Sequence, residues 1–323
     1  MIPFSGASMY HLIAATAGLM FAGIAGADTL QVPSDYPTIS DAITAAQQGD
    51  TIAIAAGTYF ESDLFIADAD ITITGDVFPD GSPAVKIDGE STHNILLAIG
   101  LAGATGATVE NLIFTGSTGN ALWIYHHSPT IRNCTFVENV SEFQGTAVWS
   151  SSTEAVFEDC RFIGNVAEAN GNIVHTKGVT GLRSGDNGSP TFRDCLFENN
   201  SGSSILQSLY WDARLEDCDF QNNAAASILH TYQGSMTLLN TVICENQGDP
   251  INGDWIDEGG NFLGEVCPAD CMGDFNGDQT IGVDDLLSLL EAYLVNADGD
   301  CDGDDDTDVD DLLLLIGVFG QNC

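Results

Sequence analysis

A ten-residue segment recurs four times in the middle of the chain, and this repetition restricts the fold more than any other feature. Each copy ends in a Cys-x-Phe-x-x-Asn pattern, and weaker copies lie at 109–114 and 239–246. From Leu112 onward, equivalent positions are separated by 22, 26, 35, 23 and 23 residues. This period, with alternating strand-like residues and Asn-rich turns, is typical of one coil of a parallel β-helix and does not fit ankyrin, tetratricopeptide or leucine-rich repeats.

Equivalent residues of successive coils should stack in columns, since neighbouring strands lie about 4.8 Å apart. The thiols and phenylalanines should point inward, where a thiol behaves as a small apolar group. The alternative is a metal or redox site, but these thiols lack the short ligand spacing and the His partners of such a site. The asparagines should lie at a turn, tolerate left-handed backbone and pass hydrogen bonds between coils. The columns are Cys134, Cys160, Cys195 and Cys218; Phe136, Phe162, Phe197 and Phe220; and Asn139, Asn165, Asn200, Asn223 and Asn246.

The segment before the repeats carries a family resemblance. Residues 32–43 (VPSDYPTISDAI) lead into GDTI at 49–52 and AGTYFE at 56–61. They resemble the N-terminal signature of right-handed β-helix proteins of the pectate-lyase-like group. The resemblance implies a mainly β chain, a right-handed parallel β-helix over residues 28–250, closed by a short helix. Thr38 would be its N-cap, and it would cover the unpaired edge of the first coil. The residues facing the coils would be Ile39, Ala42, Ile43 and Ala46.

A second strand precedes each Cys strand, and its outer face is the candidate binding site. The inward residues should be Leu122, Val148, Val174, Leu206 and Leu229. The outward pairs are Trp123 and Tyr125, Trp149 and Ser151, His175 and Lys177, Gln207 and Leu209, and His230 and Tyr232. We expect this stripe to be exposed, because these polar and bulky side chains do not suit a narrow interior. Aromatic rings with polar edges suit a glycan chain, and the outer face of one sheet is the polysaccharide groove in the resembled group.

Within this stripe we expect Trp123, Tyr125, Trp149, Gln207 and Tyr232 to bind substrate. If the chain is a polysaccharide lyase or a glycoside hydrolase, the candidate catalytic residues are His175, Lys177, His230 and Asp212. An insertion at 178–190, with Arg183 and Asp186, would form one wall of the groove.

Two alternatives to catalysis stay open for this face. The carboxylate arrangements of polygalacturonases, pectin methylesterases and pectate lyases are not recognisable in the sequence. In the first alternative, the aromatic residues only stack for stability or lie under loops. In the second, the chain is a non-catalytic cell-surface or matrix protein used for structure or adhesion.

The final 57 residues hold 15 acids and no Lys or Arg, and they contain two copies of one loop at an offset of 26. Oxygen side chains at loop positions 1, 3, 5 and 12, with a backbone carbonyl at position 7, are the EF-hand arrangement for Ca²⁺. The predicted ligands are Asp274, Asn276, Asp278, Thr280 and Asp285 in the first loop and Asp300, Asp302, Asp304, Asp306 and Asp311 in the second. Each loop runs into Asp-Leu-Leu and an apolar helix, which should fold when ions cancel the repulsion among the acids.

This duplication resembles a type I dockerin, which implies a cohesin-like or surface-protein partner. It departs from the family at position 6, where Gln279 and Asp305 replace Gly, and at the docking positions, which carry Val283-Asp284 and Val309-Asp310. We therefore expect a linker at 251–269 and a calcium-binding domain at 270–323.

The two ends of the chain suggest an exported protein. Residues 1–27 are uncharged, with an apolar run and Ala-Gly-Ala before Asp28, which indicates a cleaved secretory signal rather than a membrane span. An extracellular or cell-surface location would allow disulfides, with Cys244–Cys267 one pairing and Cys271, Cys301 and Cys323 competing for a second.

The charge narrows the choice of partner. A net charge of -40 excludes nucleic acid and disfavours an anionic membrane surface. Outside the calcium loops, 32 acids face 7 bases, so a neutral glycan, or an acidic one bridged by Ca²⁺, is the better expectation.

Overall fold

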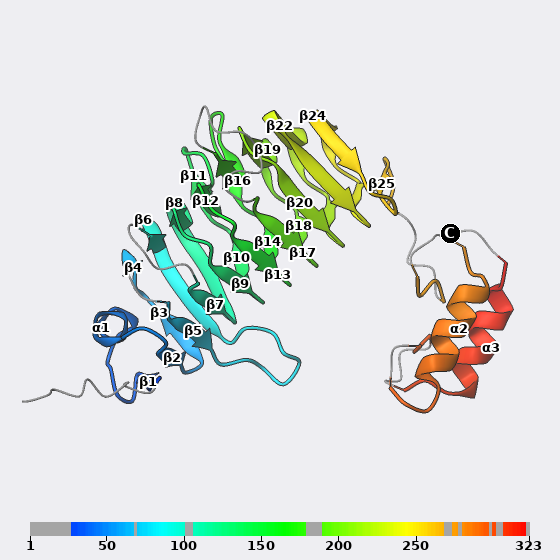
Figure 1. The fold of residues 1–323 in the computed structure, drawn as a ribbon, viewed down its shortest axis with the longest axis horizontal. Helices are drawn as coiled ribbons and strands as arrows, with labels where there is room; N and C mark the ends of the chain where they lie inside the picture. The colour runs from blue at the N-terminus through cyan, green and yellow to red at the C-terminus, as the bar shows by residue number, and fades with distance from the viewer. Residues whose placement is uncertain are drawn as a thin grey trace, which may run out of the picture.

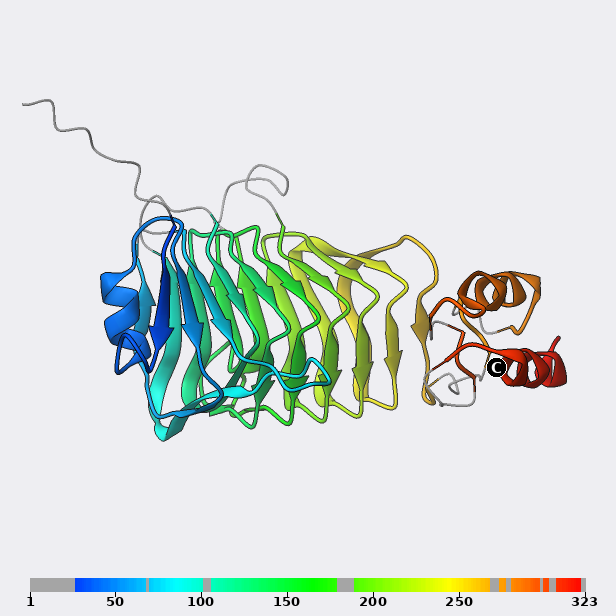
Figure 2. The same ribbon diagram turned by 90° about the horizontal axis from the view of Figure 1, so that it is seen from below.

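The computed structural model describes residues 27–67, 70–100, 106–178, 189–267, 273–276, 280–296, 299–301 and 306–320. Residues 1–26 of the predicted signal peptide and residues 179–188 of the insertion, which hold Arg183 and Asp186, lie outside these residues. The described strands form a right-handed parallel β-helix of 25 strands (Figure 1). Every pairing between named strands is parallel and joins one coil to the next, as Figure 2 shows along the length of the solenoid.

The pairings divide the coils into three faces. Face 1 contains β1 (Thr29–Val32), β2 (Thr51–Ile54), β5 (Thr72–Gly75), β7 (Thr108–Glu110), β9 (Thr130–Arg132), β13 (Val156–Glu158), β17 (Thr191–Arg193) and β20 (Ala213–Glu216). Face 2 contains β3 (Gly57–Tyr59), β6 (Val85–Gly100), β8 (Leu112–Tyr125), β10 (Thr135–Val137), β14 (Arg161–Ile163), β18 (Leu196–Glu198), β21 (Asp219–Gln221), β23 (Val242–Cys244) and β25 (Phe262–Leu263).

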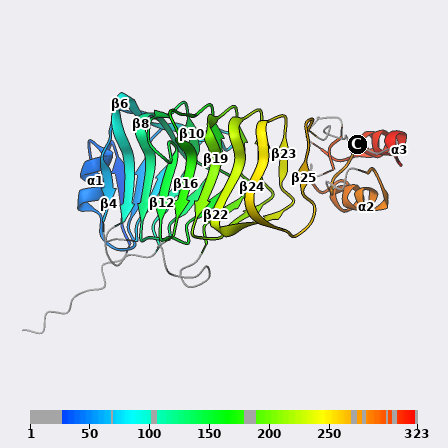
Figure 3. The same cartoon turned by 90° about the horizontal axis from the view of Figure 1, so that it is seen from above.

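Face 3 contains β4 (Leu64–Ile66), the second halves of β6 and β8, β12 (Val148–Ser151), β16 (Asn172–Lys177), β19 (Ser201–Leu209), β22 (Ala224–Leu239) and β24 (Gln247–Asp257). β11 (Val140–Ser141) and β15 (Val166–Ala167) connect faces 2 and 3, and β22 and β24 bend onward to face 1. Figure 3 views face 3, which carries the predicted binding stripe.

The apolar columns are confirmed. The four thiols and the four phenylalanines are at most 2% exposed, and Phe162, Phe197 and Phe220 stack with ring centroids 4.5 and 4.2 Å apart. Each thiol lies close to backbone carbonyls, as Cys134 Sγ does at 3.3 Å from Arg132 O. Burial raises the pKa of the Cys134 and Cys195 thiols, which keeps them protonated and unreactive.

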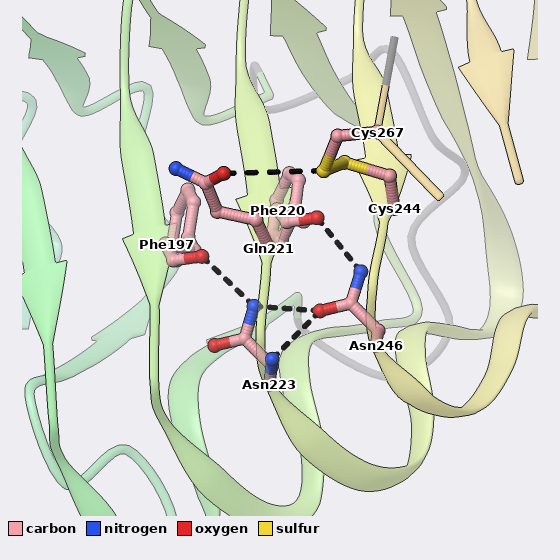
Figure 4. The surroundings of a disulfide bond; sticks show 7 residues. All are labelled: Phe197, Phe220, Gln221, Asn223, Cys244, Asn246 and Cys267. Carbon is pink, nitrogen blue, oxygen red and sulfur yellow. Dashed lines mark hydrogen bonds between the residues drawn. A yellow bond between two sulfur atoms is a disulfide. The ribbon is translucent and has the colours of Figure 1, made fainter. Parts of the chain in front are cut away.

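The asparagine column is confirmed as a hydrogen-bonded ladder, but its backbone was predicted wrongly. Asn165 donates through Nδ2 to Asn200 Oδ1 at 3.0 Å, and Asn200 does the same to Asn223 Oδ1 at 3.0 Å. Left-handed backbone belongs instead to the residue before each asparagine: Glu138, Gly164, Asn199, Asn222 and Glu245, with φ of 52–61°. The ladder residue can then turn its amide into the coil and pair with the next one (Figure 4).

The first coil is closed as predicted. Helix α1 (Ile39–Ala45) packs Ile39 and Ala42, both 0% exposed, against the core, with Ile43 and Ala46 beside them. Thr38 Oγ1 accepts the N–H of Asp41 at 3.0 Å. Glu61 adds a second cap that the sequence reasoning missed, since its carboxylate accepts the N–H groups of Ile39 and Ser40 at 2.9 and 3.0 Å.

Face 1 carries an ionic ladder on its outer side. Arg132 lies between Glu110 and Glu158, and Arg193 lies between Glu158 and Glu216, with N–O distances of 2.5–3.8 Å. Arg214 also pairs with Glu216, and with Glu258 at 2.7 Å. Each of these partly exposed ion pairs contributes roughly 0–1 kcal/mol to the stability of the fold, so their main effect is to favour one register between neighbouring strands. Three of the chain's seven basic residues are engaged in them.

The solenoid continues beyond its predicted end at residue 250. β24 pairs with β22 up to Asp257, and β25 pairs with β23, so the linker predicted from residue 251 begins too early. The predicted disulfide joins Cys244 in β23 to Cys267 and secures the chain after β25 (Figure 4). The apolar helices expected after the acidic loops are α2 (Val283–Ala292) and α3 (Val309–Val318), which share a separate small core of Ile281, Leu289 and Leu315.

Candidate functional site: an aromatic pocket on face 3

The outer side of face 3 carries a stack of aromatic rings. Trp123 in β8 pairs in register with Trp149 in β12, and their rings stack at 5.4 Å with an interplanar angle of 6°. Tyr125 stacks on Trp123 at 5.4 Å. The inward neighbours Leu122 and Val148 are fully buried, so alternation along each strand turns the indole rings away from the core.

A pocket of about 440 Å³ opens beside the two indole rings. Its lining residues are Asn120, Trp123, Glu142, Phe143, Gln144 and Trp149. Glu142 and Phe143 belong to the connection between β11 and β12, which lines the pocket, and Phe143 is 61% exposed.

Hydrogen bonds attach the connection between β11 and β12 to the sheet. Asn120 Nδ2 donates to the carbonyls of Gln144 and Gly145 at 2.8 and 2.6 Å. Gly145 has φ of +75°, and a Cβ there would lie 2.5 Å from the Val148 carbonyl, so the turn requires glycine. Glu142 and Phe143 were not among the residues predicted from the sequence. The spacing of 26 residues between Cys134 and Cys160 could have pointed to them, because it is longer than most of the other spacings and indicates a longer connection in this coil.

The predicted exposed stripe does not continue across the whole face. His175 stacks on Trp149 at 6.4 Å but is only 1% exposed, and Gln207 is 8% exposed, so the expectation that these side chains lie in an open groove is wrong. Exposure returns at Tyr232, which is 51% exposed and packs edge-to-face on Tyr210 at 5.6 Å. The stripe is therefore two aromatic patches separated by a buried polar centre.

The buried centre is a hydrogen-bonded chain of side chains. His175 Nδ1 lies 3.0 Å from Gln207 Oε1, which also accepts from Asn172 Nδ2 at 2.9 Å, and Gln207 Nε2 lies 2.8 Å from His230 Nδ1. Burial lowers the pKa of His175 to about 4, so this imidazole is neutral at pH 7. Because the amide oxygen can only accept, His175 carries its proton on Nδ1.

The candidate catalytic residues do not all belong to one hydrogen-bonded cluster. Asp212 Oδ1 accepts the N–H and the hydroxyl of Ser235 at 2.8 and 3.0 Å, which is a turn-stabilising role. Lys177 is exposed at the end of β16. Within the described parts of the chain no hydrogen bond joins Asp212 to His175, His230 or Lys177.

The two acidic loops place equivalent carboxylates in equivalent positions. Asp285 and Asp311 are 0% and 1% exposed. Asp285 accepts the N–H groups of Phe275 and Gly282 at 2.8 and 2.7 Å, and Asp311 accepts those of Cys301 and Asp308 at 2.6 and 2.7 Å.

The second loop gathers three carboxylates. One oxygen each of Asp306, Asp308 and Asp311 lie within 4.8 Å of one another. Asp308, at loop position 9, was not among the predicted ligands, and its counterpart in the first loop is Gly282. Asp274, Asn276, Thr280 and Asp300 lie in described parts of the loops, whereas Asp278, Asp302 and Asp304 lie outside the described residues.

Comparison with known proteins supports the fold. The family model "Right handed beta helix region" matches residues 38–177, in agreement with the parallel coils. The sequence matches no curated protein. None of the helices in the described residues is long and apolar enough to cross a membrane.

Several solved structures are distantly similar. Pectin methylesterase PemA from Erwinia chrysanthemi is 11% identical over 69% of this chain and 80% of its own, with a TM-score of 0.45. Pectin methylesterase from carrot is 12% identical over 74% and 82%, with a TM-score of 0.49. Pectate lyase Pel9A is 11% identical over 67% and 63%, with a TM-score of 0.44.

Proposed function

We propose that this chain is an exported glycan-binding β-helix protein, whose aromatic pocket on face 3 holds a neutral polysaccharide and whose C-terminal module binds Ca²⁺ and attaches the protein to a partner. The observation that carries the proposal is the parallel, stacked pair Trp123 and Trp149, which lines a pocket together with Phe143. Flat apolar rings beside polar groups match the faces and hydroxyl edges of a sugar ring.

The charge of the pocket favours a neutral glycan. Glu142 and the acid surplus of the solenoid repel an anionic polymer, and three of the seven basic residues already pair within the face 1 ladder. Because His175 is buried and Asp212 is committed to Ser235, we propose binding rather than cleavage as the activity of this face.

A panel of neutral and acidic polysaccharides tests this function by isothermal titration calorimetry. We expect binding of a neutral glycan that Trp149→Ala weakens at least tenfold, about 1.4 kcal/mol. Trp255→Ala is the matched control, because Trp255 is 38% exposed on β24 and does not line the pocket. Binding of no glycan by the wild type, or equal loss in both variants, would refute the proposal; new reducing ends or unsaturated products would show cleavage instead.

The acidic loops fit Ca²⁺ by the chemistry and burial of their donors. Buried carboxylates such as Asp285 and Asp311 are unfavourable without a compensating cation, and hard oxygen donors are what Ca²⁺ prefers. Asp274, Asn276 and Asp285 would hold the first ion, and Asp300, Asp306, Asp308 and Asp311 the second. A bound ion would supply the positive charge that fixes each loop against its helix.

Duplicated apolar residues on the two helices support attachment to a cohesin-like or other surface protein. Val283, Leu287 and Leu290 of α2 are 49–62% exposed, and their counterparts Val309, Leu313 and Ile316 of α3 are 49–61% exposed. The disulfide Cys244–Cys267 supports an oxidising, extracytoplasmic location. Calorimetric titration of the chelated full chain should show Ca²⁺ uptake that Asp285→Ala with Asp311→Ala abolishes; no uptake by the wild type would refute this part.

A further inference from the structure

The two ends of the solenoid are finished differently. Helix α1 covers the first coil, whereas β24 is the last strand of face 3 and bends onward to face 1 (Figure 3). Among the described residues β24 pairs only with β22, and all but one of its 11 residues are exposed. An edge strand of this length is a template for a further strand, because the backbone groups on its outer side have no strand to pair with.

The second half of β24 directs alternate backbone groups to the open side. The N–H of Glu258 donates to the Leu238 carbonyl at 2.9 Å, so the backbone of Glu258 faces β22. Successive residues of a parallel strand direct their N–H and C=O groups to opposite sides. Trp255 and Asp257 therefore point these groups away from β22, and Ile256 points its own toward β22.

The end of the apolar core is exposed beside this strand. Trp255 continues the column of Met236, which is fully buried, yet Trp255 is 38% exposed. Leu263 continues the column of the buried Ile243 and is 37% exposed. A hollow of about 300 Å³ opens at the first half of β24, between Ile243, Pro250 and Leu263. An added strand would thus find main-chain partners along one half of β24 and a hollow for an apolar side chain at the other, which is how extended peptides bind sheet edges.

The charge at this end of the solenoid selects the partner. No Lys or Arg follows Arg214 in the sequence, and Asp249 and Asp254 are exposed on β24. A second copy that paired edge to edge would bring two sets of carboxylates together, and like charges on neighbouring strands are destabilising. A strand that carries Lys or Arg would place opposite charges in the same positions.

We propose that β24 is the docking edge for an extended basic segment of another protein, which adds as a strand beyond the last coil. Its backbone pairs with Trp255 and Asp257, and its Lys or Arg side chains face Asp249 and Asp254. Pro250 has no N–H to donate, so the first half of β24 contributes the hollow rather than main-chain pairing. This surface is separate from the aromatic pocket and from the helices α2 and α3, and it does not depend on the functions proposed for them.

The test uses the full chain and a synthetic peptide of alternating Lys and Val that is as long as β24. Amide hydrogen exchange, followed by NMR, reports on the edge directly. In the free protein the amides of Trp255 and Asp257 should exchange faster than the amide of Ile256, and the peptide should slow both by about tenfold or more. Equal protection of the three amides in the free protein would show that the chain itself or a second copy already covers the edge, and would overturn the proposal; sedimentation would tell which of the two covers it.

Two N-methylated versions of the peptide separate strand addition from simple charge attraction. One is methylated on every Val amide and the other on every Lys amide, so each lacks one row of N–H donors while its charge is unchanged. Calorimetry should show binding that is about tenfold weaker for at least one of them. Equal binding of all three peptides, or no binding of the unmodified one, would refute strand addition.

A pair of charge variants tests the selection of a basic partner. Asp249→Lys with Asp254→Lys reverses the charge of the edge, and Glu154→Lys with Glu168→Lys is the matched control, since it changes two exposed acids elsewhere on the solenoid and the net charge by the same amount. The edge variant should bind the unmodified peptide about tenfold more weakly than the control does. Continued protection of the Ile256 amide would show that the last coil stays folded in both. Equal affinities of the two variants would mean that the peptide follows the overall charge of the protein, and would overturn the assignment of β24.

Discussion

Replacing Asn200 by alanine should destabilise the solenoid more than any surface substitution. Asn200 Oδ1 accepts the backbone N–H and the Nδ2–H of Asn165 at 2.9 and 3.0 Å, and Asn200 Nδ2 donates to the Phe162 carbonyl at 2.8 Å. Asn165, Phe162 and Asn200 are each at most 1% exposed. Asn200→Ala therefore leaves two donors and one acceptor buried without these partners.

Each orphaned buried group costs about 1–3 kcal/mol, so the three together predict a loss of roughly 3–9 kcal/mol. This is a large part of a typical stability of about 5–15 kcal/mol. The free energy of unfolding can be measured by urea denaturation with linear extrapolation. The thermal midpoint should fall by roughly 10 °C, at about 2–4 °C per kcal/mol for a unit of this size.

Two variants make this test specific. Asn199→Gly changes the adjacent asparagine, which is exposed and left-handed with φ of 57°, and should alter stability by only about 0.5 kcal/mol. Asn246→Ala removes the last rung, which is partly exposed, and should cost less than Asn200→Ala because water can reach the groups it releases. A loss below about 1 kcal/mol for Asn200→Ala, or an equal loss for Asn199→Gly, would show that the ladder does not stabilise the coils as argued.

Three further predictions concern titration, metal and thiols. The folded state lowers the pKa of His175 from 6.5 to about 4, so the unfolded chain binds this proton more readily and stability is lost as the pH falls below about 6.5. Denaturation at pH 7 and pH 5 should show an extra loss of about 2 kcal/mol in the wild type relative to His175→Gln; parallel losses would contradict the shift. Chelation of Ca²⁺ should reduce the helical circular dichroism of α2 and α3 and leave the β-helix signal; an unchanged spectrum would contradict ion-dependent folding. The Cys134 and Cys195 thiols should resist iodoacetamide in the folded chain and react after denaturation, as mass spectrometry would show; rapid labelling of the native protein would contradict their burial.

The stacked columns could be predicted because a solenoid converts sequence repetition directly into contact. A residue at one coil position meets its counterpart on the next coil whatever the loops do, which is why the thiol, phenylalanine and asparagine columns were recovered. The ionic ladder obeys the same rule and was missed, although Arg132, Glu158, Arg193 and Glu216 each stand two residues before the repeated cysteine. Their alternating charge was visible in the aligned copies.

Exposure on the outer faces could not be predicted in the same way. Alternation along a strand says which side chains leave the core, but not which of them other chain segments then cover. His175 and Gln207 were expected in an open groove and are buried, and Phe143 stands in a connection whose path no repeat specifies. The two acidic loops are a different case. Their fixed spacing places Asp285 and Asp311 at equivalent positions, where both carboxylates are buried and accept backbone N–H groups, but it did not point to Asp308, whose carboxylate lies within 4.8 Å of those of Asp306 and Asp311.

The column that changes residue type is the one to which we assign a function. Columns that serve packing keep one chemical class through the coils, as the thiol and phenylalanine columns and the inward Leu and Val column of face 3 do. The outer column of face 3 instead changes from Trp123 and Trp149 to His175, Gln207 and His230. Packing alone gives no reason for this change, because an imidazole and an amide stack no better than an indole and must satisfy their polar atoms when buried. The change is accounted for if the indoles present a binding surface and the polar residues form the hydrogen-bonded chain beside it.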